Sequence, residues 1–116
     1  MGSLWNEEEI AERLTNRFYE EDDVILKKFG DRGRKHTKED LLHHFNYLKS
    51  AYNLKNEQVF VDYALWLHQI LVTREVPGEM LTRSFDWIYQ ELEGLEENEQ
   101  ARFYQQCLKL AKAELV

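Results

Sequence analysis

The sequence predicts an all-α protein, an antiparallel bundle of four to five helices, and three observations support this. Apolar residues recur every three or four positions along most of the chain, as in amphipathic helices, and the alternation typical of strands is missing. The abundant residues Glu, Leu, Lys and Gln all favour helices. Short connections separate the periodic stretches, which favours antiparallel neighbours. We therefore predict a single helical-bundle domain over residues 1–116.

The first two helices are expected on either side of a glycine-containing connection. The first runs from about Trp5 to Phe29, with a break or kink near the acidic run 20–23. The second begins at Thr37, because its hydroxyl can accept a backbone N–H bond and acidic residues follow in the first turn. The segment Gly30–His36 is then a connection, in which Gly30 adopts the left-handed conformation that follows a helix end.

Three more helices complete the predicted bundle. Asn53 ends the second helix, and Asn56 caps the third, which should be the most buried because it is apolar on more than one side. Pro77 fits the first turn of the fourth helix, Gly94 fits its end, and the last helix runs over about 97–115. The main core positions are Ile10, Leu14, Phe18, Leu41, Phe45, Leu48, Tyr52, Val59, Phe60, Tyr63, Leu67, Leu81, Phe85, Ile88, Leu92, Phe103, Cys107 and Leu110.

Charge is distributed unevenly along the chain. The formal net charge is -7, which disfavours binding to nucleic acid. Residues 24–38 nevertheless carry six bases and one acid, whereas residues 1–23 carry eight acids and two bases. We interpret this basic segment as neutralising the acidic first helix. The alternative is an anion site formed by Arg32, Arg34 and the free N–H groups of a helix beginning at Thr37. The six bases are Lys27, Lys28, Arg32, Arg34, Lys35 and Lys38.

Catalytic and metal-binding patterns are weak in this sequence. A di-iron bundle needs Glu-x-x-His motifs, and the nearest approach is Asp40 to His43. The single cysteine, Cys107, lies on an apolar stripe and cannot form an internal disulfide. Nucleophile and phosphate-binding motifs are missing as well. We therefore expect no metal, no cofactor and no enzymatic activity.

Several residues are candidates for a ligand pocket or an interface. Asp62 lies between apolar positions of the third helix, so we expect a buried carboxylate with a partner such as His44, Tyr47 or an arginine. The two tryptophans of the third and fourth helices are open to three interpretations: core packing, an internal ligand pocket or a subunit interface. The full candidate set is His44, Asp62, Tyr63, Trp66, Phe85 and Trp87.

A spaced pattern over roughly residues 24–95 resembles a known group of helical modules. It comprises Phe29-Gly30-Asp31-Arg32-Gly33-Arg34, Asp40, His44, Tyr47-Leu48, Ala51, Phe60-Val61-Asp62-Tyr63, Trp66-Leu67, Leu71 and Val76-Pro77. The pattern is similar to modules that precede cobalamin-binding or other signalling domains in bacterial sensors, and more loosely to the globin-like amino-terminal domains of stressosome proteins. The resemblance implies a bundle that pairs with itself or with a neighbouring module in sensing or signalling.

The cofactor motif of the light-sensing cobalamin proteins is missing from this chain. In that family a Trp is followed ten and eleven positions later by Glu and His, but counting from Trp66 gives Val76 and Pro77. The resemblance therefore implies no cobalamin here, and it implies no haem, because the stressosome-type domains are haem-free.

Together these observations predict a non-catalytic bacterial interaction module in a sensory or regulatory role. Its expected partner is a second copy of itself, forming a homodimer, or another signalling protein, with no nucleic acid and no membrane. A single cysteine and the lack of a secretory leader or a long apolar run predict a cytoplasmic location. The alternative is a small-ligand-binding protein with an aromatic pocket between the third and fourth helices.

Overall fold

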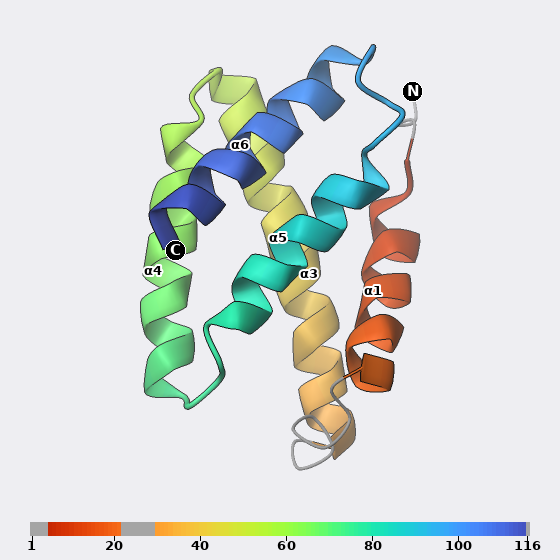
Figure 1. The fold of residues 1–116 in the computed structure, drawn as a ribbon, viewed down its shortest axis with the longest axis vertical. Helices are drawn as coiled ribbons and strands as arrows, with labels where there is room; N and C mark the ends of the chain where they lie inside the picture. Colours follow the sequence, from red (N-terminus) through yellow and green to blue (C-terminus); the bar gives the residue numbers. More distant parts are fainter. Residues whose placement is uncertain (1–4, 22–29, 116) are drawn as a thin grey trace. The chain divides into compact units, whose positions relative to one another are not determined.

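The computed structural model describes residues 5–21 and 30–115, and every regular element in these ranges is an α-helix (Figure 1). This confirms the predicted all-α bundle. The helices are α1 (Glu7–Glu21), α3 (Gly30–Leu54), α4 (Gln58–Thr73), α5 (Glu79–Glu91) and α6 (Glu99–Leu115). The chain divides into two compact units, residues 1–45 and 46–116, and α3 contributes to both. That the whole chain is one domain stays a prediction.

In the first unit, α1 buries the apolar stripe that the sequence predicts. Ile10, Leu14 and Phe18 are all buried, and the side chain of Asn6 accepts the N–H of Glu9 at 3.0 Å, which caps the helix start. The helix ends at Glu21, inside the acidic run. Residues 22–29 lie outside the described part of the chain, so the predicted extension to Phe29 and the bases Lys27 and Lys28 lie outside it too.

The start of α3 differs from the prediction. The helix begins at Gly30 and includes the whole segment that was expected to connect two helices. Gly30 does have a positive φ of 62°, as predicted. Thr37 lies inside the helix, however, where its hydroxyl donates to the carbonyl oxygen of Gly33 at 3.0 Å. The predicted N-cap at Thr37 is therefore wrong, because a Thr hydroxyl can bond to the preceding helical turn as readily as it can cap a helix.

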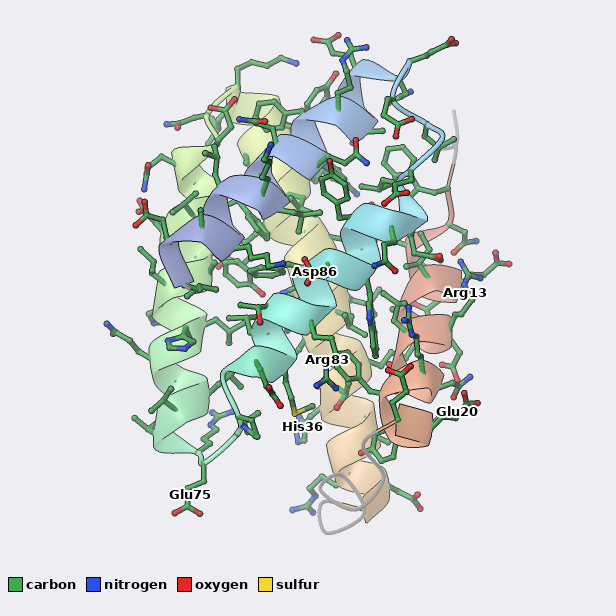
Figure 2. The ribbon with its side chains drawn as sticks, viewed as in Figure 1. Arg13, Glu20, His36, Glu75, Arg83 and Asp86 are labelled. Carbon is green, nitrogen blue, oxygen red and sulfur yellow. The ribbon has the colours of Figure 1, made fainter. Side chains whose placement is uncertain are left out.

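In the second unit, α6 packs against both α4 and α5, and α5 and α6 run in opposite directions (Figure 1). The predicted stripe of α5 is buried in full, and the ring of Phe85 lies 5.2 Å from the ring of Phe60 on α4. On the outside, the ammonium group of Lys112 contacts both carboxylate oxygens of Asp86, at 2.8 and 2.9 Å (Figure 2). The unit therefore combines an apolar core with an ion pair between α5 and α6.

Two helices of the second unit end in the same way, although glycine is missing from both ends. Lys55 follows α3 with φ 54°, and Glu75 follows α4 with φ 61°. After α3, the N–H of Asn56 bonds to the carbonyl oxygen of Ala51 at 3.0 Å, and the N–H of Lys55 bonds to that of Tyr52 at 3.1 Å. This pair of bonds defines a Schellman motif, with a lysine at the position that usually holds glycine.

The residues at the starts of the helices match their predicted roles in some cases and not in others. Asn56 accepts the N–H of Gln58 at 3.0 Å, as a capping side chain would, but the N-cap position itself is held by Glu57, whose side chain makes no capping bond. Pro77 lies just before α5 and not in its first turn, and its carbonyl oxygen accepts the N–H of Met80. Asn98 caps α6 by accepting the N–H of Ala101 at 3.0 Å, a role that the sequence analysis missed. No helix in the described ranges has the length and apolar character needed to cross a bilayer.

Candidate interaction surface

Helix α4 carries very little charge for a helix that is exposed on one side. Among its 16 residues, Asp62 is the only acid, and Lys and Arg do not occur. The sequence predicts that this helix is the most buried of the bundle, because it is apolar on more than one side. The structure corrects this, because the residues at helical spacing along one side are exposed: Asp62, Leu65, Trp66, Gln69, Val72 and Thr73. The opposite side buries Phe60, Val61, Ala64 and Leu67.

The exposed side of α4 is apolar at its centre. Leu65 is 36% exposed, Trp66 57% and Val72 54%. Tyr47 of α3 is 41% exposed and stacks on Tyr63, with ring centroids 3.9 Å apart and planes 10° from parallel. We call these four exposed apolar residues, together with Asp62, Gln69 and Thr73, the α4 surface. Because a contiguous exposed apolar patch is a mark of protein contact sites, this surface is the leading functional candidate.

The six predicted pocket residues do not share one environment. Tyr63, Phe85 and Trp87 are buried, whereas Trp66 lies on the exposed side of α4. Asp62 is exposed and accepts a hydrogen bond from the side-chain amide of Gln58 at 2.8 Å. This overturns the expectation of a buried carboxylate. Trp66 is therefore the exposed aromatic member of this set, although its ring lies 6.5 Å from the ring of buried Tyr63.

His44 is the one histidine that burial affects strongly. Its side chain is 2% exposed. Removal from water is the main cause of its lowered pKa, which falls from 6.5 to about 3, and the neighbouring charge of His43 lowers it further. A neutral imidazole in this position contributes to packing and is not poised for proton transfer near neutral pH.

In the described part of the basic segment, two bases, Arg34 and Lys38, pair with acids of α1, which agrees with the interpretation that this segment neutralises the first helix. Arg34 lies 4.0 Å from the carboxylate of Glu12, and its guanidinium group covers the ring of Tyr19 at 5.2 Å. Lys38 forms ion pairs with Glu8 and Glu12, and these bonds raise the pKa of Lys38.

The structure does not support the part of the alternative anion site that was expected at Thr37. Arg32 is exposed, but Thr37 lies in the interior of α3, where backbone N–H groups bond within the helix. The free N–H groups that the site required at Thr37 are therefore missing.

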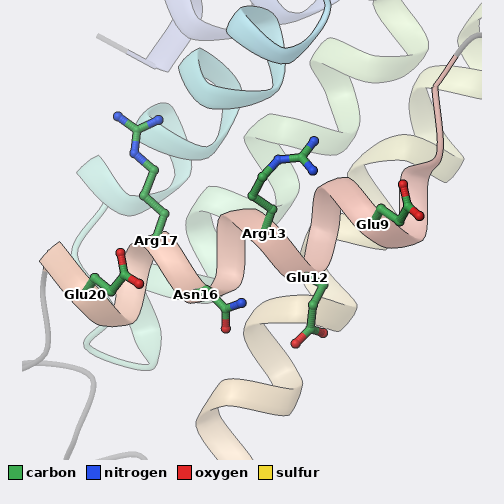
Figure 3. Close-up of a pocket in the computed structure, with 6 residues that line it drawn as sticks. All are labelled: Glu9, Glu12, Arg13, Asn16, Arg17 and Glu20. Carbon is green, nitrogen blue, oxygen red and sulfur yellow. The ribbon is translucent and has the colours of Figure 1, made fainter.

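An open depression follows the outer side of α1 (Figure 3). Its volume is about 600 Å³, and its lining residues are Glu9, Glu12, Arg13, Asn16, Arg17 and Glu20. All of them come from one helix, and Arg17 forms an ion pair with Glu21 at 3.6 Å. Small-molecule sites are concave and enclose most of the ligand surface. A depression on a single helix encloses too little to favour ligand binding.

Catalytic chemistry has little support among the described residues. Cys107 is buried, and loss of contact with water is the main cause of its raised pKa of about 12. Its thiol is therefore protonated at neutral pH and is a poor nucleophile. In residues 5–21 and 30–115, no group of three or more His, Cys, Asp or Glu side chains has an arrangement that could hold a metal ion.

Comparison with protein-family models, curated proteins and solved structures finds no match to this chain. Function must therefore be inferred from the chain's own residues. Among the features described above, the α4 surface has the strongest physical reason to bind something, because it leaves a tryptophan and three other large apolar side chains in water.

Proposed function

We propose that this chain is a non-catalytic protein-interaction module that forms a homodimer through the α4 surface. The observation that carries the proposal is the exposure of Trp66, 57%, at the centre of an apolar helix side. Tryptophan has a large area to bury, and it is among the residues that contribute most to the free energy of binding at protein interfaces. A second helix packed on this side would remove that area from water.

The shape of the surface favours a macromolecular partner over a small ligand. The α4 surface is the outer side of a helix with one neighbouring tyrosine, so it is convex and cannot enclose a small molecule. A helix side of this kind is covered well by another helix, whose side chains interdigitate with its own.

Charge favours a second copy at this surface. The chain carries a formal net charge of -7, so two copies repel each other over most orientations. Asp62 is the only charged residue of the α4 surface, and approach there meets the least repulsion. One helix side is smaller than the roughly 800 Å² that each partner buries in a standard interface. We therefore expect a reversible dimer with a dissociation constant on the order of micromolar.

Reversible pairing also suits the sensory or regulatory role that the sequence resemblance implies. A weak dimer changes its population when the concentration of the chain or the state of a neighbouring module changes. The sensory or regulatory role is part of this proposal and depends on formation of the dimer.

Sedimentation velocity over a concentration series tests the homodimer. For the wild-type chain we expect the mass to rise from 14.0 kDa toward twice that value. Trp66→Glu should remain monomeric throughout the same range, because it places a carboxylate at the centre of the apolar contact. Leu54→Glu is the matched control, since Leu54 is 67% exposed at the end of α3 and lies outside the α4 surface. It should associate like the wild type.

Two results would overturn the proposal. The first is a wild-type chain that stays at 14.0 kDa at every concentration. The second is a Trp66→Glu variant that associates as tightly as the wild type. Circular dichroism of each variant separates loss of association from loss of folding.

A further inference from the structure

Gln69 lies at the centre of the α4 surface. On a helix, the residues three and four positions before and after a given residue are its neighbours, with Cβ atoms about 5–6 Å apart. Three of the neighbours of Gln69 are large apolar side chains exposed to water. A partner that covers them therefore covers Gln69 as well. The four neighbours are Leu65, Trp66, Val72 and Thr73, and all belong to the α4 surface.

The three polar residues of the α4 surface differ in their hydrogen bonds. The hydroxyl of Thr73 donates to the carbonyl oxygen of Ile70 at 2.6 Å. The carboxylate of Asp62 accepts a hydrogen bond from Gln58. Among the residues that the structure describes, the side-chain amide of Gln69 has no hydrogen-bond partner. It is exposed, so water hydrogen-bonds to it in the free chain, and a dimer that excludes this water must replace those bonds.

We propose that the side-chain amides of Gln69 from two copies hydrogen-bond to each other at the twofold axis of the dimer, and that this contact selects a second copy as the partner. The inference rests on the homodimer proposed above and adds its specificity-determining residue. In a twofold dimer both copies use the same surface, so the residue at the centre of that surface meets the same residue of the other copy.

A carboxamide is suited to meeting an identical group across a twofold axis. Its N–H donates and its carbonyl oxygen accepts, so two such amides form two equal hydrogen bonds with each other. A charged side chain at the same position would meet a like charge, which opposes association. A single polar residue inside an apolar contact between helices fixes the register of the pair at some cost in affinity, whereas a wholly apolar contact tolerates other registers and partners.

Opposite charges at position 69 test whether the two side chains face each other. Gln69→Glu and Gln69→Lys should each weaken self-association about tenfold or more, because each places two like charges at the axis. An equimolar mixture of the two variants should associate about tenfold more tightly than either alone, since opposite charges then meet. Sedimentation velocity at low ionic strength, where charges are least screened, measures all three samples. Position 69 is exposed and both new residues favour helices, so circular dichroism should show an unchanged fold.

Gln106 provides the matched control, because it is an exposed glutamine on α6 and lies outside the α4 surface. Gln106→Glu and Gln106→Lys change the net charge by the same amounts as the variants at position 69. Each should dimerise like the wild type, and their mixture should associate no more tightly than the separate variants do. A gain in affinity that appears only in the mixture of position-69 variants therefore comes from contact between the two side chains.

Gln69→Leu tests whether the two amides bond to each other. This variant should self-associate at least as tightly as the wild type, because an apolar pair at the axis leaves no polar group to satisfy. A mixed dimer of the wild type and Gln69→Leu should be about fivefold or more weaker than the wild-type homodimer, since one amide is then covered without a partner. Fluorescence-detected sedimentation with one of the two chains labelled measures the mixed dimer.

The outcomes distinguish the amide contact from the dimer itself. If the wild type dimerises and the mixture of Gln69→Glu and Gln69→Lys is no tighter than either variant, the two side chains do not meet, and the homodimer stands without this contact. A mixed dimer with Gln69→Leu that is as tight as the wild-type homodimer also overturns the amide pairing. A wild-type chain that stays monomeric at every concentration removes the proposed function together with this inference.

Discussion

At the scale of single residues, two helix ends hold strained backbone without glycine. Lys55 ends α3 with φ 54°, a conformation that costs a residue with a Cβ atom roughly 1 kcal/mol or more. The side chain of Lys55 also lies over the ring of Tyr52 at 3.6 Å and pairs with Glu99 at 3.7 Å. We therefore compare Lys55→Gly with Lys55→Ala, which loses the same contacts, and expect the free energy of unfolding of the glycine variant to be higher by about 0.5 kcal/mol, because only glycine relieves the strain.

Urea denaturation of matched variants measures this effect. Lys49→Gly is the control, since Lys49 is an exposed residue in the interior of the same helix. It should have a free energy of unfolding about 1 kcal/mol below that of Lys49→Ala, so the difference between glycine and alanine changes sign with position. If glycine is less stable than alanine at both positions, the left-handed conformation at Lys55 is not strained.

His44 should make stability depend on pH in a defined range. Its pKa falls from 6.5 to about 3 on burial, so below pH 6.5 the unfolded chain binds a proton that the folded chain does not. Proton binding therefore stabilises the unfolded state as the pH falls below 6.5, and the contribution of neutral His44 to the stability of the fold is complete only above that pH. Between pH 7 and pH 5 this lowers the free energy of unfolding by about 2 kcal/mol.

Comparison of the wild type with His44→Gln isolates this contribution, because the carboxylates titrate alike in both chains. Urea denaturation at pH 7 and pH 5 should show that the wild type loses about 2 kcal/mol more than the variant. Equal losses would mean that His44 becomes protonated in the folded state. The stability of the variant at pH 7 does not affect this comparison, because each chain is compared with itself at the two pH values.

At the scale of helices, the structure differs from the sequence prediction at two capping positions. Thr37 lies inside α3, so Thr37→Ala should change the free energy of unfolding by only about 0.5 kcal/mol or less. Asn98 does cap α6, and Asn98→Ala should cost about 1 kcal/mol. Thermal or urea unfolding of the pair measures the difference. A larger loss for Thr37→Ala than for Asn98→Ala would mean that α3 begins at Thr37 in solution.

Regular apolar spacing predicts the helices, but it predicts their buried sides unevenly. On α6 the predicted core position Leu110 is 39% exposed, and the buried side is formed by Tyr104, Cys107 and Leu108. On α5 the spacing of Leu81, Phe85, Ile88 and Leu92 is sufficient, and all four are buried. The first turns of α3 have no such spacing, since they hold two glycines and several bases. Their helical form is supported by ion pairs from Arg34 and Lys38 to α1, and contacts between distant segments are not visible in a local pattern.

The candidate surface was predictable only in part. Trp66 stands out in the sequence because large aromatic residues are candidates for both cores and interfaces. An apolar helix does not reveal which of its sides the rest of the fold covers, so the exposure of Trp66 and Asp62 became visible only in the structure. The sequence indicates Tyr47 only as a possible partner of Asp62. Its stacking on Tyr63 joins two helices whose register the sequence does not specify.

At the scale of the whole molecule, folding and association should be coupled. A dimer formed through the α4 surface binds the folded chain and not the unfolded one, so it adds stability that grows with protein concentration. We expect the thermal unfolding midpoint of the wild type to rise by several degrees over a hundredfold increase in concentration, since about 1 kcal/mol shifts the midpoint of a domain of this size by roughly 4 °C or more.

The variants of the α4 surface determine whether this coupling comes from the proposed contact. The unfolding midpoint of Trp66→Glu should not change with protein concentration, whereas that of Leu54→Glu should rise as in the wild type. Each variant gains a carboxylate at an exposed apolar position, but only Trp66 belongs to the α4 surface. Differential scanning calorimetry at matched concentrations makes the measurement. A midpoint that rises equally in all three chains would place the association elsewhere on the molecule, since loss of Trp66 would then leave the contact intact.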